Sequence, residues 1–580
     1  MQIEKNQKLL LGNAAIARGL YEAGCVFVSS YPGTPSTEIT EEAAKYDEIY
    51  AEWATNEKVA YEAALGAAIA GGRAFTGMKH VGLNVAADPL FTSSYTGVNA
   101  GLVVAVADDP AMHSSQNEQD SRHYAVAAKL PMLEPSDSTE CLEFIKLAYN
   151  ISEKFDTPVM LRLTTRISHS QGLVTLANRQ ELPLKEYIKN DSKYVMKPAN
   201  ATKRHPVVEQ RQSDIEEYAN TSTLNRIEFN DKKIGIISAG DSYVYAKEAF
   251  GTSVSYLKLG MVNPLPLKLI KKFTDQVDKI YVIEELDSII ESFCKANGVN
   301  VEGKNMLPVI GEYSQQLLNK NLLSKENDYN ELKINIPVRP PVMCAGCPHR
   351  GTFYVLKKLG LTVIGDIGCY TLGSTIDTTV CMGASVSMLH GFNKVRPESA
   401  DKRVGVIGDS TFMHSGITGL VDIIYNNSYS TLLILDNSIT GMTGHQQNPC
   451  TGLTLKNLPA KAVSLETLCK ACGVENIQTV DPNEVDTFEK ILKSELTKDA
   501  PSVIILKRPC ALLKTVKKDS YARVDADKCK SCRACMKIGC PRISFETKKA
   551  VIDESLCIGC GLCTRMCKFD AIEIISRASN

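Results

Sequence analysis

The chain of 580 residues has no long apolar segment and almost no net charge. No apolar run approaches the roughly 20 residues that a helix needs to span a bilayer, so we expect no membrane-spanning segment. Its 65 basic and 66 acidic residues leave a formal charge of −1, which provides no electrostatic case for binding nucleic acid. The leucines at 9–11 are followed by Asn13 and Arg18, which indicates an amphipathic helix and not a signal peptide.

Cysteine, in contrast, is abundant, with 19 residues. So many cysteines in a small secreted protein would indicate disulfides. Here eight of them lie in the last 60 residues at the spacing of metal-cluster ligands, which favours a reducing cytoplasm.

The length is too great for one hydrophobic core, so about three to five domains are expected. Alternating apolar and helix-like segments predict an α/β domain over residues 1–190, and the polar stretch 191–230 predicts an irregular linker. Strand–turn–helix patterns predict a second α/β domain over 231–335 and a third over 336–515. A small, cysteine-rich α+β domain is expected over 520–580.

The third domain contains a strand–helix–strand pattern that ends in metal-binding residue types. An apolar run at 403–407 ends at Gly408-Asp409-Ser410, and a second run at 432–435 ends at Asp436-Asn437. Ligands of open α/β sheets bind at the carboxyl ends of parallel strands. Mg2+ prefers oxygen ligands, and proteins usually supply only some of them while phosphates of the bound ligand supply others. It could therefore be held here by the Asp409 carboxylate, the Asn437 amide and the Ile439 carbonyl. The alternative is an ordinary unit whose aspartate only caps a helix.

The residues that follow suit a phosphorylated ligand. Thr440 and Gly441 offer backbone N–H groups of the kind that bind a diphosphate. His445 would then lie near the reacting end of that ligand.

In the first domain, polar residues follow several predicted strands. The loop after the strand at 25–28 places Thr34 at the sheet edge, and the strand at 102–107 is followed by a polar stretch that contains Arg122 and His123. Glu57 lies at the start of a helix that begins near Asn56. A first-turn glutamate is also favoured by the helix dipole alone.

Four further cysteines lie in the third domain. Cys344 and Cys347 form a Cys-x-x-Cys pair, whereas Cys369 and Cys510 each follow a predicted strand. Together they could hold an iron–sulfur cluster, but they could equally include a redox pair, a zinc half-site or plain buried cysteines.

The C-terminal cysteines have the strongest pattern in the sequence. Two runs of Cys-x2-Cys-x2-Cys are each followed by a fourth cysteine after four or three residues, as in bacterial two-cluster ferredoxins. In that pattern the fourth cysteine binds the other cluster, which predicts one 4Fe-4S cluster on Cys529, Cys532, Cys535 and Cys567, and a second on Cys557, Cys560, Cys563 and Cys540. A zinc module is the alternative.

The strand–helix–strand unit resembles the thiamine-diphosphate motif, with Ser410 and Asp436 departing from its usual residues. With Tyr31–Ser36, Cys344–Arg350 and the ferredoxin tail, the whole chain resembles the alpha subunit of indolepyruvate:ferredoxin oxidoreductase, within the 2-oxoacid:ferredoxin oxidoreductases. The resemblance implies a multidomain α/β thiamine-diphosphate fold. It would comprise a pyrimidine domain, a transketolase C-terminal-like domain, a diphosphate domain and an α+β two-cluster ferredoxin domain.

The resemblance also implies the chemistry and the site. An aryl pyruvate and coenzyme A would give aryl-acetyl-CoA and carbon dioxide, with electrons passing to ferredoxin, as in aromatic amino acid catabolism. Glu57 would activate thiamine diphosphate through its N1′ atom, with Glu52 and Glu62 as rivals, and Thr34 would lie against the substrate. Arg122 or His123 could meet the substrate carboxylate.

A smaller beta subunit in an α2β2 assembly is implied as a partner. Two rival functions remain at this point: another 2-oxo-acid oxidoreductase or thiamine decarboxylase, and an electron-transfer subunit with an inert thiamine fold.

Overall fold

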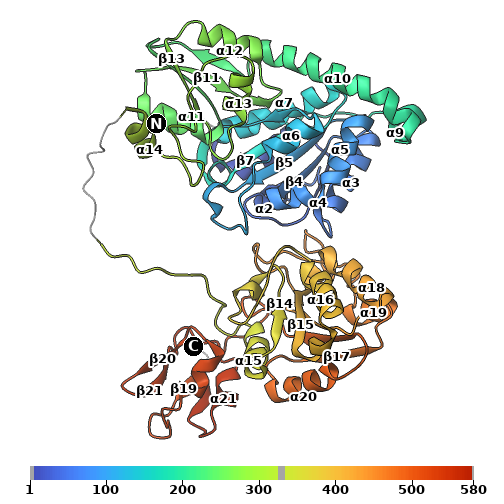
Figure 1. Cartoon of the computed structure of the whole chain (residues 1–580), viewed down its shortest axis with the longest axis vertical. Coiled ribbons are helices and arrows are strands. Elements are labelled where there is room, and N and C mark those ends of the chain that lie inside the picture. The colour runs from blue at the N-terminus through green and yellow to red at the C-terminus, as the bar shows by residue number, and fades with distance from the viewer. Residues whose placement is uncertain (1–5, 324–333, 578–580) are drawn as a thin grey trace. The chain divides into compact units, whose positions relative to one another are not determined.

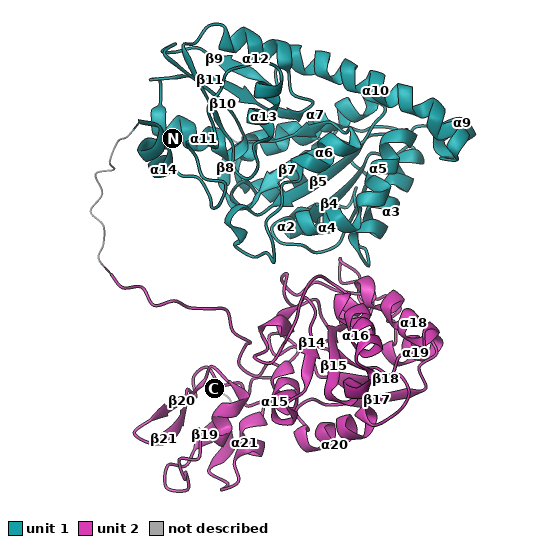
Figure 2. Ribbon diagram, in the orientation of Figure 1, with its two compact units in different colours: residues 1–333 teal, residues 334–580 magenta. Residues whose placement is uncertain are grey.

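A computed structural model describes residues 6–323 and 334–577 (Figure 1). These residues form two compact units, residues 1–333 and 334–580 (Figure 2). The boundary that the sequence predicted at residue 335 lies beside 324–333, which are outside the described residues.

The first unit is built on a seven-stranded sheet of order β12-β6-β7-β5-β4-β2-β3. All neighbours are parallel except the β12–β6 pair at one edge. The strands are β2 (Phe27–Ser30), β3 (Tyr50–Trp53), β4 (Ala74–Lys79), β5 (Leu102–Asp108), β6 (Met132–Leu133), β7 (Val159–Thr164) and β12 (Met261–Asn263). The apolar run at 102–107 forms the central β5, which is buried on both faces, as expected for a parallel sheet.

Helices cover this sheet. They include α1 (Gly12–Glu22), α2 (Thr37–Ala43), α3 (Glu57–Ile69), α4 (His80–Val85), α5 (Ala87–Thr96), α6 (Arg122–Ala128) and α7 (Ser138–Phe155). The leucines at 9–11 lie in strand β1 (Gln7–Leu11), which pairs with β8 (Gln171–Thr175), so the predicted N-terminal helix begins only at Gly12.

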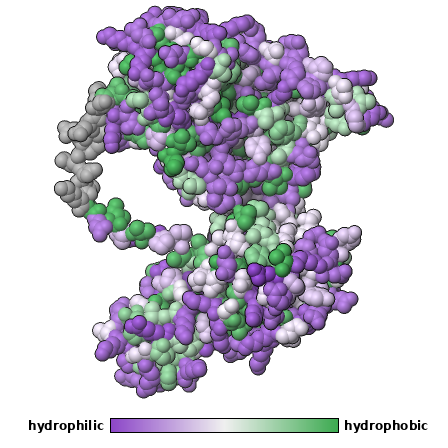
Figure 3. Space-filling model, viewed as in Figure 1, coloured by the Kyte–Doolittle hydropathy of each residue, from purple (hydrophilic) through white to green (hydrophobic). Residues whose placement is uncertain are grey.

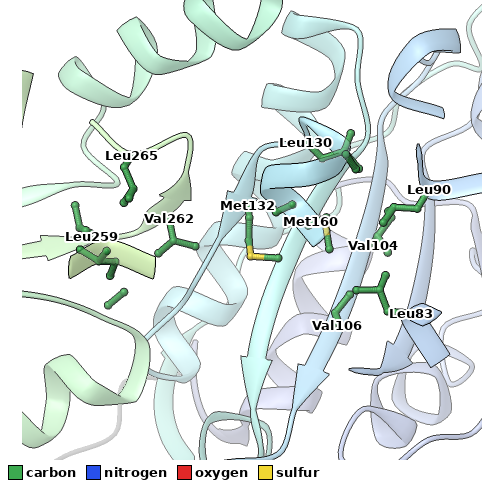
Figure 4. Packing of buried hydrophobic residues seen from close by; sticks show 14 of the residues in the cluster. Leu83, Leu90, Val104, Val106, Leu130, Met132, Met160, Leu259, Val262 and Leu265 are labelled. Carbon is green, nitrogen blue, oxygen red and sulfur yellow. The ribbon is translucent and has the colours of Figure 1, made fainter. Parts of the chain in front are cut away.

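A four-stranded sheet, β13-β10-β11-β9, is also part of the first unit. Its strands are β9 (Arg226–Glu228), β10 (Ile234–Ala239), β11 (Ser255–Leu259) and β13 (Lys279–Ile283), accompanied by α11 (Gly240–Phe250), α12 (Leu267–Thr274), α13 (Ile289–Ala296) and α14 (Gln315–Leu323). One hydrophobic core joins the two sheets: Leu259, Val262 and Leu265 belong to the same cluster as Met132 and Met160 (Figure 4). Burial of this shared surface makes the two parts one unit.

The prediction of an irregular linker over 191–230 is wrong for most of its length. Residues Pro198–Thr221 form the 24-residue helix α10, which starts with a proline in its first turn. Val208, Ile215 and Ala219 are buried at helical spacing, while the rest of the helix is mostly polar. Because most residues of this segment are polar, its narrow apolar stripe was not recognised in the sequence.

The second unit contains a parallel five-stranded sheet of order β14-β15-β16-β18-β17. Its strands are β14 (Thr362–Ile364), β15 (Arg403–Gly408), β16 (Thr431–Asp436), β17 (Asn476–Val480) and β18 (Ser502–Lys507). The helices include α15 (His349–Leu359), α16 (Ala384–Val395), α18 (Ile417–Tyr425), α19 (Leu465–Ala471) and α20 (Val485–Leu496).

A small α+β domain follows in the same unit. It comprises the antiparallel pairs β19 (Ser520–Val524) with β22 (Ile572–Ser576) and β20 (Ile543–Glu546) with β21 (Lys549–Ile552), and the helix α21 (Leu562–Met566). The predicted fold class, α/β domains with a small α+β tail, is confirmed.

The surface shown in Figure 3 is mainly hydrophilic, with scattered hydrophobic residues. None of the helices in the described ranges combines the length and hydrophobicity that a bilayer crossing demands.

Candidate functional site

The carboxyl edge of the five-stranded sheet brings the predicted diphosphate-binding residues together. Strands β15 and β16 are adjacent and in register, with Gly408 opposite Leu435. Asp409 therefore follows one strand where Asn437 follows its neighbour, and both are buried, with 2% and 8% of their surfaces exposed. A carboxylate and an amide oxygen at one buried edge fit a Mg2+ ion shared with a diphosphate.

Asp409 is held in an electrostatically costly position. Burial, and then the nearby charge of Asp436, raise the pKa of its carboxyl to about 7. A cation at this edge would offset that cost, because an opposite charge favours the ionised form.

Asn448 is a member of this site that the sequence analysis missed. Its Nδ2 donates to Asp409 Oδ2 at 3.2 Å, and its Oδ1 accepts the Cys450 backbone N–H at 2.9 Å. The second bond fixes which end of the amide faces Asp409. The only local pattern was Asn-Pro, which indicates a turn and not a ligand.

The remaining diphosphate residues lie close by. Thr440 Oγ1 donates to Ser410 Oγ at 2.8 Å, and the Ile439 backbone N–H donates to Asn437 Oδ1 at 3.2 Å. A Cβ added to Gly441 would lie 3.5 Å from the Asn437 amide nitrogen, so this backbone is within the same edge.

The strand order also brings in the four cysteines of the third domain. Cys369 follows β14 and Cys510 follows β18, on either side of the β15–β16 pair. The Cys510 N–H donates to the Asn437 carbonyl at 2.9 Å, and the Cys510 thiol lies 3.7 Å from His445 Nε2.

These cysteines are close enough to affect one another's ionisation. Burial, and then the charges of Cys510 and Cys344, raise the pKa of Cys369 to about 11. Burial raises the pKa of Cys347 to about 12, where Cys344 and Cys369 also contribute. Crowded thiols of this kind ionise readily only when a metal binds them.

The two C-terminal cysteine sets line two separate cavities. One cavity is lined by Cys529, Cys532, Cys535 and Cys567, and the other by Cys540, Cys557, Cys560 and Cys563. Each run of three cysteines thus meets the fourth cysteine of the other run, which is the crossed arrangement of two-cluster ferredoxins.

No group of three or more His, Cys, Asp or Glu in the described ranges is compact enough to hold a single metal ion. The crossed sharing of the fourth cysteines favours iron–sulfur clusters over a zinc module.

In the first unit, Glu57 is the first residue of α3, after the N-cap Asn56, whose side chain accepts the Val59 N–H. Glu57 is 5% exposed, and a Cβ added to Gly82 would lie 2.5 Å from its Oε1, so only glycine permits this packing. Its rivals differ: Glu62 is exposed and paired with Lys58, and Glu52 accepts hydrogen bonds from Ser29 and Tyr50.

Thr34 is half-buried after β2, beside Gly33, whose added Cβ would lie 3.1 Å from Lys79 Cβ at the end of β4. It therefore lies at the carboxyl edge of the seven-stranded sheet, as the sequence predicted.

The structure contradicts the proposed substrate contact of Arg122. The side chain is 1% exposed, and each of its nitrogens donates to a protein oxygen, including those of Asp120 and Glu284 at 2.6 Å. Although burial opposes its charge, these two carboxylates hold the pKa of Arg122 above its usual value. Through Glu284, which follows β13, Arg122 links α6 to the four-stranded sheet. His123 is exposed and pairs with Asp287 at 2.8 Å.

Comparisons with known proteins find family matches in three parts of the chain. Residues 18–234 match the thiamine-diphosphate-binding family of pyruvate flavodoxin/ferredoxin oxidoreductases, 366–506 match the C-terminal binding domain of thiamine pyrophosphate enzymes, and 550–573 match a 4Fe-4S binding domain. The chain thus carries domains for thiamine diphosphate and for iron–sulfur clusters.

Whole-length relatives are also found. The indolepyruvate oxidoreductase subunit IorA of Archaeoglobus fulgidus is 40% identical over 98% of both chains. The protein of the same name from Thermococcus kodakarensis is 40% identical over 97% of this chain and 96% of that one. A more distant relative, the 2-oxoglutarate synthase subunit KorA of A. fulgidus, is 24% identical over 52% of this chain and 96% of that one.

Proposed function

Because this chain belongs to the family of the indolepyruvate oxidoreductase subunit IorA, we propose that it oxidatively decarboxylates aryl pyruvates, indolepyruvate among them. The 2-oxo acid and coenzyme A give aryl-acetyl-CoA, carbon dioxide, one proton and two electrons. The electrons leave one at a time through iron–sulfur clusters to ferredoxin.

The observation that carries the proposal is the composition of the second unit. One sheet edge holds Asp409 and Asn437 between Cys369 and Cys510, and the same unit contains both ferredoxin-type cysteine cavities. A decarboxylase without an oxidative step has no use for such a set of cysteines.

The chain's own residues have distinct roles in this proposal. Asp409, Asn437 and the Ile439 carbonyl would hold Mg2+, while Gly408, Ser410, Thr440 and Gly441 would bind the diphosphate. When bound, thiamine diphosphate supplies the nucleophile and the electron sink for decarboxylation. Glu57 would activate thiamine diphosphate through its N1′ atom, and Thr34 and His445 would contact the substrate.

The cysteine sets support two clusters of ferredoxin type. Cys344, Cys347, Cys369 and Cys510 would bind a third cluster beside the diphosphate edge. The domains are a pyrimidine-type domain (1–190), a transketolase C-terminal-like domain (231–335), a diphosphate domain (336–515) and a ferredoxin domain (520–580). The partners are a beta subunit, in an α2β2 assembly, and ferredoxin, in the cytoplasm.

An anaerobic assay with the partner subunit tests this function. Reduction of ferredoxin or a dye is followed with indolepyruvate and with pyruvate, each with and without coenzyme A. We expect reduction that depends on coenzyme A and favours the aryl substrate.

Turnover of pyruvate alone would keep the chemistry and refute the substrate. No reduction with either substrate, in protein that lacks bound thiamine, would refute the enzyme and support an electron-transfer subunit. Release of an aldehyde instead of acyl-CoA would indicate a non-oxidative decarboxylase.

A further inference from the structure

Arg350 is a buried cation that joins the Cys-x-x-Cys loop to the ferredoxin domain. Its side chain is 4% exposed. Nε donates to the Cys344 carbonyl at 2.9 Å and Nη2 to the Met343 carbonyl, while Nη1 donates to the carbonyls of Ile538, at 3.2 Å, and Gly539. Gly539 directly precedes Cys540, so one guanidinium contacts the backbone of two cysteine-bearing loops.

All of these partners are neutral carbonyls. In the described ranges no carboxylate forms an ion pair with Arg350, and the residue lies in the first turn of α15, at the positive end of the helix dipole. A buried charge is costly unless an opposite charge is near. Within residues 6–323 and 334–577, this cation therefore has no anionic partner.

The two cysteine sites that flank Arg350 are adjacent, because residues of the Cys-x-x-Cys loop line the cavity of the other site. Ala345 and Gly346, between Cys344 and Cys347, line the cavity of Cys540, Cys557, Cys560 and Cys563. A Cβ added to Gly346 would lie 2.1 Å from the Ile558 side chain, so glycine permits this close approach.

We propose that Arg350 is the buried counter-ion of the iron–sulfur clusters on either side of it and raises their reduction potentials. Four thiolates give a cluster a negative charge that grows by one on reduction, so a fixed cation nearby favours the reduced form. Arg350 is a positioning and electrostatic residue and does not bind iron. The proposal rests on the proposed function only in that it needs the chain to carry its clusters.

The test is a redox titration of the purified, cluster-loaded protein, followed by electron paramagnetic resonance without substrate. Arg350→Gln removes the charge. The equilibrium constant for reducing the cluster on Cys540, Cys557, Cys560 and Cys563 should fall about tenfold, which is about 59 mV for a one-electron couple. The equilibrium constant for reducing the cluster on Cys529, Cys532, Cys535 and Cys567 should change less than threefold.

Arg565→Gln is the matched control. Arg565 also links the ferredoxin domain to the diphosphate domain, through Glu484, with an Nη1–Oε2 distance of 2.8 Å. This pair is exposed, with 44% and 45% of the two side chains accessible, so solvent screens it. The control should leave both potentials unchanged.

Arg350→Lys separates charge from shape, because it keeps the cation but loses the planar fork. For this variant we expect equilibrium constants for cluster reduction within about threefold of those of the wild type. Unchanged potentials in a cluster-loaded Arg350→Gln protein would overturn the proposal. So would loss of the clusters in both Arg350 variants, which would show that the contacts and not the charge matter. Because no substrate is present, these results do not depend on which 2-oxo acid the enzyme uses.

Discussion

Substitution of Asn448 tests the diphosphate site at a residue that binds neither metal nor cofactor in our proposal. Asn448→Leu keeps the number and branching of the side-chain non-hydrogen atoms but removes the donor to Asp409. Both residues are buried, with 7% and 2% exposed, and the bond is 3.2 Å long. A hydrogen bond to a charged group contributes about 1.5–3 kcal/mol.

This energy gives the expected size of the effect. At about 1.4 kcal/mol per tenfold, it corresponds to a loss of roughly 10- to 100-fold in affinity, the range found when outer-shell partners of metal ligands are removed. Without Asn448, the carboxylate can rotate away from the position that Mg2+ requires. The affinity for Mg2+, measured by calorimetry with saturating thiamine diphosphate, should fall by that factor.

Asn426→Leu provides the control for this measurement. Asn426 also donates to a carboxylate, that of Asp422, at 2.8 Å, but on the exposed end of α18. It should leave the affinity unchanged. Asn448→Ser keeps an oxygen for the Cys450 N–H but is too short to reach Asp409, and should lose as much affinity as the leucine variant. An affinity within threefold of wild type for folded Asn448→Leu would refute the reasoning.

Three further predictions follow from the same structure. Glu57→Gln should lower turnover at least 100-fold while thiamine diphosphate still binds, whereas Glu62→Gln, on the exposed face, should not; equal rates for both variants would contradict the role of Glu57. Arg122→Lys should lower the free energy of unfolding by about 3 kcal/mol, because the buried carboxylates of Asp120 and Glu284 lose the planar guanidinium that binds them, and it should not change the KM for the 2-oxo acid. A raised KM at unchanged stability would restore the substrate role of Arg122. Burial raises the pKa of Asp366 to about 6. Between about pH 6 and pH 4 this carboxyl is therefore protonated in the folded chain but ionised in the unfolded chain. Through this group, stability should rise by up to about 3 kcal/mol as pH falls across that window, and denaturant unfolding of Asp366→Asn should lack this component.

Local patterns were the most reliable guide to this fold. The apolar runs at 403–407 and 432–435 became β15 and β16, and the helix expected near Asn56 begins at Glu57. Such elements depend on residues within a few positions of each other, so their causes can be read directly along the chain.

Burial and partner choice were not readable in the same way. The polar segment at 198–221 forms α10 because a few buried side chains suffice to dock it. Arg122 looked like a loop residue facing a substrate, yet its guanidinium is held by Asp120, two positions away, and by Glu284, 162 positions away. The more distant of these two carboxylates follows a strand of the four-stranded sheet, so the local sequence could not show it.

The sequence by itself determined the chemistry available to this protein: the cysteine spacing of a two-cluster ferredoxin, the Asp409 and Asn437 oxygens, and the glutamate at the start of α3. Only the tertiary structure decided which of these groups meet. The order β14-β15-β16-β18 places Cys369 and Cys510 around the diphosphate edge, and Arg350 lies between two cysteine loops almost 200 residues apart. Strand order follows from packing the whole apolar core, to which residues far apart contribute together, so no short stretch of sequence contains it.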